Sequence, residues 1–463
     1  MNGHSNNSSD SNGAADMSKP VPLWIAGKQV QTETTFPVTS PTTTEHLWTS
    51  SSVSAPLALE ALDAAQTAFK TWRHATPAEI RKILLRAADI FEARRDELAG
   101  YMKAETGALA NFAGFNTTQS IEVLRDVAGR SAHILGEIPK PPHLALGPSF
   151  SKSPGNTVVL KGSELSPRTF WALGSVMKEA GLPDGVLSVI YHRPEDAVEV
   201  TNAIIESAVV KKVNFTGSTL VGSIYASKAG KELKPVLMEL GGKASAIVCE
   251  DAEVESAAMQ CAMGAFIHAG QVCMATERIL VNRKILDKFA EALKGASEKI
   301  YAAEGEAPVL VAKATVEKNH KLLADAVAKG GKVIAGDVDP REDSAYRMRP
   351  VIVSDVKKGM DLYYTESFGP SVSLIAVESD EEAIEIANDT EYGLSGAVFT
   401  QNLGRGLKIA KQIDSGAVHI NSMSIHDEAT LPHGGVKKSG WGRFNAQWGL
   451  EEFLKLKTVT YME

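Results

Sequence analysis

The strongest constraint on the fold is an alternation of strand-like and helix-like segments that runs from about residue 157 to residue 420. Short runs rich in Val, Ile and Ala alternate with longer runs whose apolar residues recur at the spacing of one helix face. Such alternation is typical of parallel sheets whose connecting helices cover both faces. The pattern therefore predicts an α/β protein with two Rossmann-like parallel-sheet domains.

The expected elements form two series that meet near residue 240. In the first series, strands are expected at 157–160, 186–190 and 209–215, and helices at 168–180, 195–206 and 219–229. In the second, strands are expected at 244–248, 278–281, 332–335, 350–353, 396–399 and 417–420, and helices at 254–268, 284–299, 315–329, 380–388 and 403–412. Helices at 55–71, 77–99 and 117–135 precede both series. The alternating segment 454–461 predicts an edge strand, which is suited to pairing with another subunit.

Composition excludes several classes of function. The formal net charge is −8 and no basic run occurs, which argues against a nucleic-acid partner. The longest apolar runs are too short to cross a bilayer. Residues 1–18 are polar and predict a disordered tail rather than a signal peptide. The cysteines at 249, 261 and 273 form no C-x-x-C pair, so neither disulfides nor a metal site is expected and a reducing, cytoplasmic location is favoured.

Cys273 is the candidate nucleophile. It lies in Gly-Gln-Val-Cys-Met-Ala-Thr (270–276), between an Ala- and Gly-rich helix and a strand, where its sulfur could reach a cleft. A buried, inert cysteine is the common alternative, and it is the interpretation we give to Cys249 and Cys261.

Glu239 is the candidate general base. It ends the apolar run Val-Leu-Met and begins Glu-Leu-Gly-Gly-Lys (239–243). A carboxylate at the carboxyl end of a strand lies where α/β sheets place ligand chemistry. A surface charge or helix cap is the alternative. Together, a thiol and a lone carboxylate are what an enzyme needs to oxidise an aldehyde through a thioester that activated water hydrolyses.

Two segments could bind a dinucleotide. The strand at 209–215 runs into Thr-Gly-Ser-Thr-Leu-Val-Gly (216–222) and a helix, so Gly217, Ser218 and Gly222 could bring backbone N–H groups to a phosphate. Lys161 and Glu164 follow another strand and could bind ribose hydroxyls. A carboxylate there would repel a 2′-phosphate, which favours NAD over NADP. The alternatives are an ordinary strand–Gly–helix turn and a solvated ion pair.

Two further positions are candidates. In Glu-Ser-Phe-Gly-Pro (366–370), Glu366 could hold the nicotinamide ribose and Phe368 could pack beside it, unless the segment is only a turn. Asn421 begins a long loop that could form one wall of a substrate pocket.

These segments together resemble the aldehyde dehydrogenase superfamily. The motifs F-T-G-S-T-x-x-G, E-L-G-G-K, G-Q-V-C, E-S-F-G-P and P-H-G-G-V-K-x-S-G-x-G-R occur in the order typical of that family, and the resemblance extends from about Val21 to Thr460. His-Asp-Glu (426–428), Lys-Gly-Ser-Glu (161–164) and Trp-Gly-Leu-Glu-Glu-Phe (448–453) look most like the branch that acts on vanillin, benzaldehyde or salicylaldehyde.

The resemblance implies roles and boundaries. It makes Cys273 the nucleophile and Glu239 the general base of an NAD-dependent oxidation, with no metal. The NAD-binding residues would be Lys161, Glu164, Gly217, Ser218, Gly222, Leu240, Glu366 and Phe368. An NAD-binding domain (19–239, with part of a small β oligomerisation extension near 130–150) would precede a catalytic domain (240–425). Residues 426–463 would return to the first domain and end in an oligomerisation strand, giving a homodimer or homotetramer.

One segment departs from the family pattern. Family members place a strand and a Pro-Trp-Asn segment before Gly-Asn-Thr-Val-Val-Leu-Lys, and that Asn donates to the oxyanion. Here residues 140–154 contain no Trp-Asn and no expected strand, and the linker near 301–313 is also short. Losing one oxyanion donor typically costs on the order of 10²–10³ in kcat.

Three hypotheses follow from this departure: a working dehydrogenase in which another group replaces the Asn, a weakened or inactive relative that keeps binding or assembly, and a sequence that lacks an exon fragment. Acyl-CoA-forming oxidation is disfavoured because Glu239 is present to activate water. A phosphorylating reaction with His268 as base is disfavoured for the same reason.

Overall fold

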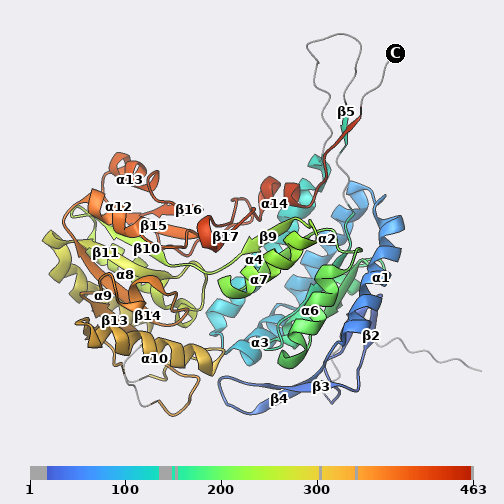
Figure 1. Cartoon of the computed structure of the whole chain (residues 1–463), viewed down its shortest axis with the longest axis horizontal. Coiled ribbons are helices and arrows are strands. Elements are labelled where there is room, and N and C mark those ends of the chain that lie inside the picture. Colours follow the sequence, from blue (N-terminus) through green and yellow to red (C-terminus); the bar gives the residue numbers. More distant parts are fainter. Residues whose placement is uncertain (1–17, 135–148, 152–154, 302–304, 339–341, 460–463) are drawn as a thin grey trace, which may run out of the picture.

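The computed structural model describes residues 18–134, 149–151, 155–301, 305–338 and 342–459. Two halves lie side by side, and strands β9 (Val236–Glu239) and β17 (Gly440–Trp441) lie between them (Figure 1). Except for Ser18, the tail predicted at 1–18 lies outside the described residues. The mixed α/β architecture with parallel-strand sheets is the fold class predicted from the sequence. No helix in the described ranges is both long enough and apolar enough to span a membrane.

The half drawn on the left of Figure 1 is built on a seven-stranded sheet. Its order is β12 (Lys332–Ala335), β13 (Val351–Ser354), β14 (Ser371–Val377), β11 (Thr276–Asn282), β10 (Ala244–Val248), β15 (Ser395–Phe399) and β16 (Ala417–Ile420). Strand β12 is antiparallel to β13, and the other neighbours are parallel. Every residue of β10, β11 and β15 is buried, as expected for parallel strands that helices cover on both faces.

Helices cover both faces of this sheet, as the alternation predicts. Ala246 and Val248 pack with α8 (Val254–Phe266) and α9 (Leu286–Ile300) on one face. Ile247 packs on the opposite face. The helices on that second face are α10 (Lys313–Ala328), α12 (Asp380–Asn388) and α13 (Leu403–Ala410).

Among the described residues, the other half contains seven longer helices and two small sheets that hold its parallel strands. The helices are α1 (Ala55–Trp72), α2 (Pro77–Ala93), α3 (Arg95–Thr106), α4 (Ala110–Arg130), α5 (Pro167–Glu179), α6 (Ala197–Glu206) and α7 (Thr219–Lys231). The sequence predicted one helix at 77–99, but Arg94 leaves the helical region at φ −102° and ψ 17° and separates α2 from α3. It also placed the start of α4 at residue 117, seven residues too late, because Asn111, Gly114 and Asn116 interrupt the apolar pattern of its first turns.

The parallel strands of this half are divided between the two sheets. One has the order β2 (Lys28–Val30), β1 (Leu23–Ile25), β7 (Leu187–Ile190) and β6 (Val158–Lys161), and the other has β17, β9 and β8 (Val213–Thr216). Among the described residues, no strand pairs with the outer edge of β6 or of β8. From the sequence we infer that this chain lacks a strand that family members have before Gly155. Two separate sheets, ending at β6 and at β8, are consistent with the loss of that strand.

A buried carboxylate fixes the helix that follows β6. Glu105 accepts hydrogen bonds from the Trp48 indole (3.0 Å), from the backbone N–H groups of Arg168 and Thr169 (2.8 and 2.9 Å) and from the Thr169 hydroxyl (2.6 Å). Because these donors include the first N–H groups of α5, Glu105 satisfies groups that the helix itself cannot. It thereby holds the first turn of α5.

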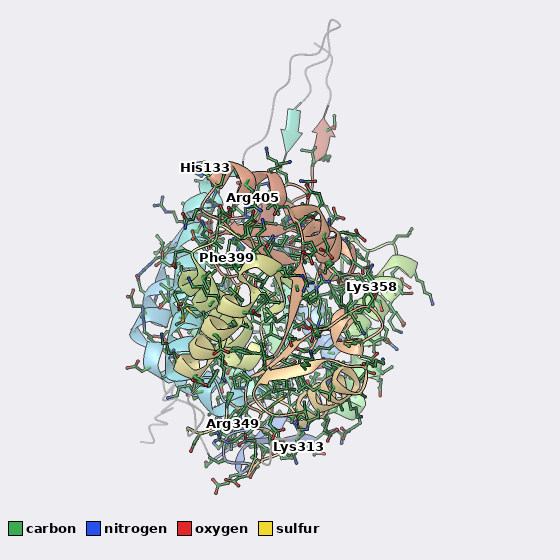
Figure 2. All side chains as sticks on the ribbon, turned by 90° about the vertical axis from the view of Figure 1, so that its left-hand side faces the viewer. His133, Lys313, Arg349, Lys358, Phe399 and Arg405 are labelled. Atoms are coloured by element: carbon green, nitrogen blue, oxygen red, sulfur yellow. The ribbon has the colours of Figure 1, made fainter. Side chains whose placement is uncertain are left out.

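Four N-terminal strands, β17 and one further strand were not predicted. Strands β1 and β2 form a hairpin against β7, and β3 (Thr35–Thr39) pairs with β4 (His46–Ser51). The expectation of no strand between residues 140 and 154 is wrong, because β5 (Ser149–Ser151) pairs antiparallel with β18 (Lys457–Val459). Three residues are too few for periodicity to reveal β1, β2 and β5, and β5 pairs with a strand that is distant in sequence. The β5–β18 ribbon projects from the body (Figures 1 and 2).

The hydrogen-bond pattern shows which amides face the open edges. Val158 and Gly162 donate to residues of the β7 segment at 2.8 Å, so the amides of alternate residues between them point away from β7. In β8, Val213 and Gly217 donate to the β9 segment in the same way.

We expect hydrogen exchange to report the division of the sheet. The amides of Lys161 and Thr216 face the open edges and should exchange at least tenfold faster than those of Leu160 and Phe215, because exchange slows when an amide is hydrogen-bonded in a stable strand. Residue-resolved exchange measured by mass spectrometry checks this. Equal protection of all four amides would mean that another strand occupies the gap.

Candidate active site

Two glycines after β9 allow three segments to meet. A Cβ at Gly242 would overlap the carbonyl oxygen of Cys273, and a Cβ at Gly241 would lie 2.7 Å from the carboxylate of Glu366. The backbone N–H of Gly242 donates to that carboxylate at 2.7 Å. The turn after Glu239 is thus packed directly against the Cys273 loop and the segment that carries Glu366.

The Cys273 loop is held in an unusual backbone conformation. Residues 268–270 have φ values of 49°, 56° and 72°, the left-handed region that non-glycine residues seldom adopt. The Gln271 side chain accepts from the backbone N–H of Val311 at 2.8 Å and donates to the carbonyl of His268 at 3.0 Å. These bonds fix the turn that presents Cys273, which is partly exposed.

The Cys273 thiol lies in surroundings that disfavour its anion. Burial, followed by the negative charges of Glu239 and Glu366, raises the pKa of Cys273 to about 12, although the backbone N–H groups of Cys273 and Met274 oppose the shift. A positive charge placed beside the sulfur would therefore be needed to generate the thiolate.

Glu239 is buried, and its two carboxylate oxygens differ. Oε2 lies 3.1 Å from Nε2 of His433, whereas Oε1 has no hydrogen-bond partner among the described residues. Its backbone carbonyl accepts from Gly217 at 3.0 Å. One oxygen is thus held, and the other is a buried acceptor without a partner among the described residues.

A buried ion pair supports the site from behind. Lys243 donates to Glu277 at 2.5 Å and to the carbonyl of Thr365 at 2.7 Å. Glu277 also accepts from the backbone N–H groups of Ser367 (2.8 Å) and Phe368 (3.1 Å). The backbone of Phe368 is left-handed, at φ 48°, so this pair fixes a strained turn next to Glu366.

Glu366 is a carboxyl in a low-polarity position. Burial, then the charge of Glu277, raises its pKa to about 7, and the hydrogen bond from Gly242 acts in the opposite direction. A buried carboxyl with an unusual pKa is typical of functional sites, where it can bind a hydroxyl group in either protonation state.

The predicted cofactor residues lie around β6, β8 and β9. Lys161 and Glu164 are 3.9 Å apart and each about one-third exposed, and burial lowers the pKa of Lys161. Ser218 caps α7 by accepting from Val221 at 3.3 Å.

Gly222 and Leu240, two further predicted cofactor residues, pack α7 against the turn after β9. A Cβ at Gly222 would overlap the side chain of Leu240, so the two pack closely. On the first turns of α7, Leu220 is 72% exposed and Ile224 is 45% exposed, which gives an apolar surface beside a helix N-terminus. This combination fits a nucleotide, with its phosphates at the helix end and its base on the apolar surface.

Asn421 holds the start of the long loop rather than presenting a free side chain. Its Oδ1 accepts from the backbone N–H of Thr400 (3.0 Å), and its Nδ2 donates to the Thr400 carbonyl (2.9 Å). Farther along, Ser424 is bonded to Thr276 and to the Met274 carbonyl, both at 2.7 Å, which ties the loop to the Cys273 segment.

The other candidate thiols and bases are engaged elsewhere. Burial raises the pKa of Cys249 to about 12, and Cys261 is completely buried. His268 stacks on Phe112 with ring centroids 4.4 Å apart, and burial lowers its pKa to about 4. In the described part of the chain, no group of His, Cys, Asp or Glu side chains could hold a metal ion.

Three polar residues of the site were not singled out by the sequence analysis: His433, Lys243 and Glu277. All three lie inside the quoted motif segments or next to them, but the contacts that define their roles join segments far apart in the chain.

Comparison with known proteins gives one consistent family. The model of the aldehyde dehydrogenase family matches residues 24–147 and 153–459. A vanillin dehydrogenase of Pseudomonas sp. (strain HR199 / DSM 7063) is 38% identical over 475 residues, covering 95% of this chain and 97% of the relative. A salicylaldehyde dehydrogenase of Pseudomonas sp. (strain C18) is 37% identical, covering 94% and 96%.

Solved structures agree. The salicylaldehyde dehydrogenase of Pseudomonas putida G7, complexed with salicylaldehyde, has a TM-score of 0.92 at 34% identity and covers 96% of this chain and 98% of its own. A betaine aldehyde dehydrogenase of Staphylococcus aureus in complex with NAD+ has a TM-score of 0.90 at 28% identity, covering 95% and 94%. The vanillin dehydrogenase alignment, at 475 positions, is longer than the 463 residues of this chain, so that relative has residues that this chain lacks.

Substitution of Gly242 by Ala tests the packing of the site. We expect Gly242→Ala to lower the free energy of unfolding by roughly 1–3 kcal/mol, because the new methyl group must displace the Cys273 backbone. The matched control is Gly230→Ala, near the end of α7, where a Cβ meets nothing within 4 Å. That variant should be neutral or more stable by up to about 1 kcal/mol. Chemical denaturation measures both, and equal effects would contradict the close packing.

Proposed function

The chain belongs to the aldehyde dehydrogenase family and is an oxidoreductase that acts on aldehydes; on that premise we propose that it uses NAD to oxidise an aromatic or polyketide-derived aldehyde to its carboxylic acid. The observation that carries the proposal is the packing of the Glu239–Gly242 turn directly against the Cys273 loop. It brings a thiol nucleophile and a carboxylate base into one site.

In the proposed mechanism, the Cys273 thiolate attacks the carbonyl carbon and gives a thiohemiacetal. Departure of hydride from that carbon leaves a thioester on the same sulfur. Glu239 then removes a proton from water through its unpartnered Oε1, and the resulting hydroxide displaces the Cys273 thiolate to release the acid. When bound, NAD+ supplies the hydride acceptor and a positive charge that favours the thiolate.

The backbone N–H of Cys273 is the proposed oxyanion donor. The side-chain Asn typical of the family has no counterpart in this sequence before Gly155. With one donor instead of two, we expect kcat to be lower by on the order of 10²–10³ than with both, unless another group compensates.

The proposed NAD site uses the residues around α7 and β6. Ser218 and the first N–H groups of α7 would bind the phosphates, with Gly217, Gly222 and Leu240 shaping the approach. Lys161 and Glu164 would bind the adenine ribose, while Glu366 and Phe368 would hold the nicotinamide ribose. The partly buried carboxylate of Glu164 favours NAD over NADP.

The substrate class is proposed from the relatives. Vanillin, salicylaldehyde and benzaldehyde dehydrogenases are among the most similar curated proteins. The second candidate function is a weakened or inactive relative that retains NAD binding or a scaffold role. The division of the NAD-domain strands at β6 and β8 favours this alternative, because the ends of both strands carry proposed cofactor residues.

Assembly and location complete the proposal. The β5–β18 ribbon projects from the body and has no further strand paired with it in the described ranges, so we propose that it joins subunits in a homodimer or homotetramer. Because the nucleophile is a thiol that must stay reduced, we propose a reducing compartment such as the cytoplasm.

Replacement of Cys273 tests the reaction. We expect the wild-type protein to form NADH from benzaldehyde, vanillin or salicylaldehyde, and Cys273→Ala to lose at least about 10³-fold of that rate, because the covalent step requires the sulfur. Absorbance of NADH measures both. Cys261→Ala, at a buried cysteine outside the site, is the control. Equal rates in wild type and Cys273→Ala would exclude this nucleophile. NAD binding without turnover in the wild type would establish the second candidate function.

Replacement of Glu164 tests the cofactor. We expect Glu164→Gln to raise the ratio of NADP to NAD activity by roughly tenfold, since one repulsive charge near the 2′-phosphate is removed. The ratio of kcat/KM for the two cofactors measures this, with the exposed Glu60→Gln as control. An unchanged ratio would place the ribose elsewhere.

A further inference from the structure

The side chain of His433 contacts the carboxylate that we assign as the base. His433 lies in the Pro-His-Gly-Gly segment after the long loop, and its Nε2 is 3.1 Å from Oε2 of Glu239. We propose that His433 is a positioning residue that orients Glu239 and sets the pH range in which Glu239 can remove a proton from water. This inference rests on the proposed function and extends it to a residue that acts through Glu239.

The contact with His433 makes the two carboxylate oxygens of Glu239 different. Oε2 accepts the hydrogen bond from the imidazole, and Oε1 is buried with no partner among the described residues. The side chain of Glu239 is 5% exposed and that of His433 is 17% exposed, so water competes weakly for their bond. A carboxylate held at one oxygen presents the other in a fixed direction, which is what general-base catalysis requires.

The backbone on both sides keeps the imidazole in place. The backbone N–H of His433 donates to the carbonyl of Phe444 at 3.1 Å, and the backbone N–H of Phe444 donates to the carbonyl of His433 at 2.7 Å. The next residue, Gly434, has φ 157°, and a Cβ there would overlap the Gly442 carbonyl. Gly440, in the segment between His433 and Phe444, pairs with Glu239, so the same stretch of chain holds the base and its partner.

Three charged groups act on the imidazole. Burial lowers the pKa of His433, but the hydrogen bond and charge of Glu239 and the charge of Asp427 outweigh it, so the pKa lies above its usual value despite the opposing charge of Arg443. Asp427 Oδ1 is 3.9 Å from Nδ1 and is oriented by Asn445, which donates to it at 2.7 Å.

The sign of the pH effect follows from these groups. Below its raised pKa, His433 is an imidazolium, and a proton transferred to Glu239 would break the ion pair between them. Above that pKa, neutral His433 can still donate from Nε2, but the charge is gone. Thioester hydrolysis should therefore increase as the pH rises through a value above about 6.5, the usual pKa of histidine.

The step itself balances without any additional reactant. Water gives a proton to Oε1 of Glu239 and its oxygen bonds to the thioester carbon. The bond from that carbon to the sulfur of Cys273 then breaks, and the sulfur leaves as a thiolate. His433 exchanges no atom with the substrate, so its loss should slow hydrolysis and spare the earlier formation of NADH.

Stopped-flow measurement of NADH formation with benzaldehyde, across pH 5.5 to 9 (roughly the range that brackets a histidine pKa), separates the two phases. His433→Phe removes the donor, and we expect a first-turnover burst to remain while the steady rate falls by about tenfold or more. His433→Gln keeps an N–H donor that does not titrate. It should restore the steady rate to within about threefold and remove the histidine limb of the pH profile.

Two further variants sharpen the result. Asp427→Asn should move the same limb to lower pH by less than about one unit, because Asp427 is 43% exposed and its charge is screened. His74→Gln, at an exposed histidine in another part of the fold, should leave the profile unchanged.

Several outcomes would overturn the inference. A His433→Phe protein with the steady rate and pH profile of the wild type would do so, as would equal loss of the burst and the steady rate, which indicates a purely structural role. Failure of His433→Gln to recover the rate of His433→Phe would also do so. A wild type that forms no NADH at all would instead refute the proposed function, and the inference with it.

Discussion

The buried ion pair between Lys243 and Glu277 is the interaction on which the rest of the site depends. Their side chains are 0% and 5% exposed, so each charge needs the other. Removing one partner of such a pair typically costs about 3–5 kcal/mol, because the remaining charge stays buried. Glu277 also holds the backbone of Ser367 and Phe368. One interaction therefore connects the turn after β9, the strand that follows the nucleophile and the segment that carries Glu366.

The two halves of the molecule differ in whether their parallel strands form one continuous sheet. The seven-stranded sheet is continuous, its strands β10, β11 and β15 are buried on both faces, and it places Cys273 just before β11. On the other side, β6 and β8 each end a sheet, although Lys161 and Thr216 lead into the proposed cofactor turns. The proposed nucleophile thus lies next to the continuous sheet, whereas Glu239 and most of the proposed cofactor residues lie on or beside the two smaller sheets. Under the proposed function, affinity for NAD is the property that the division of the described strands between β6 and β8 should affect most.

Much of the fold could be predicted because its signals are local. The strands of the large sheet are apolar runs, and glycine-bounded motifs mark Cys273 and Glu239. Other features depend on partners far along the chain. Three-residue strands such as β1 and β5 carry no periodicity, and they form because β7 and β18 complete them. The contact of His433 with Glu239 has no local signal either, since a histidine beside two glycines is also an ordinary turn.

The central claim is that an acyl group is carried on Cys273 and removed by water that Glu239 activates. Glu239→Gln should still form this thioester but release it slowly, so the acyl enzyme should accumulate. After reaction with NAD and benzaldehyde followed by acid quenching, mass spectrometry of the digested protein should find a benzoyl group on the peptide that contains Cys273. The account predicts that adduct in Glu239→Gln and little of it in the wild type. NADH formation in Glu239→Gln with an unmodified Cys273, or with the adduct on another residue, would contradict it.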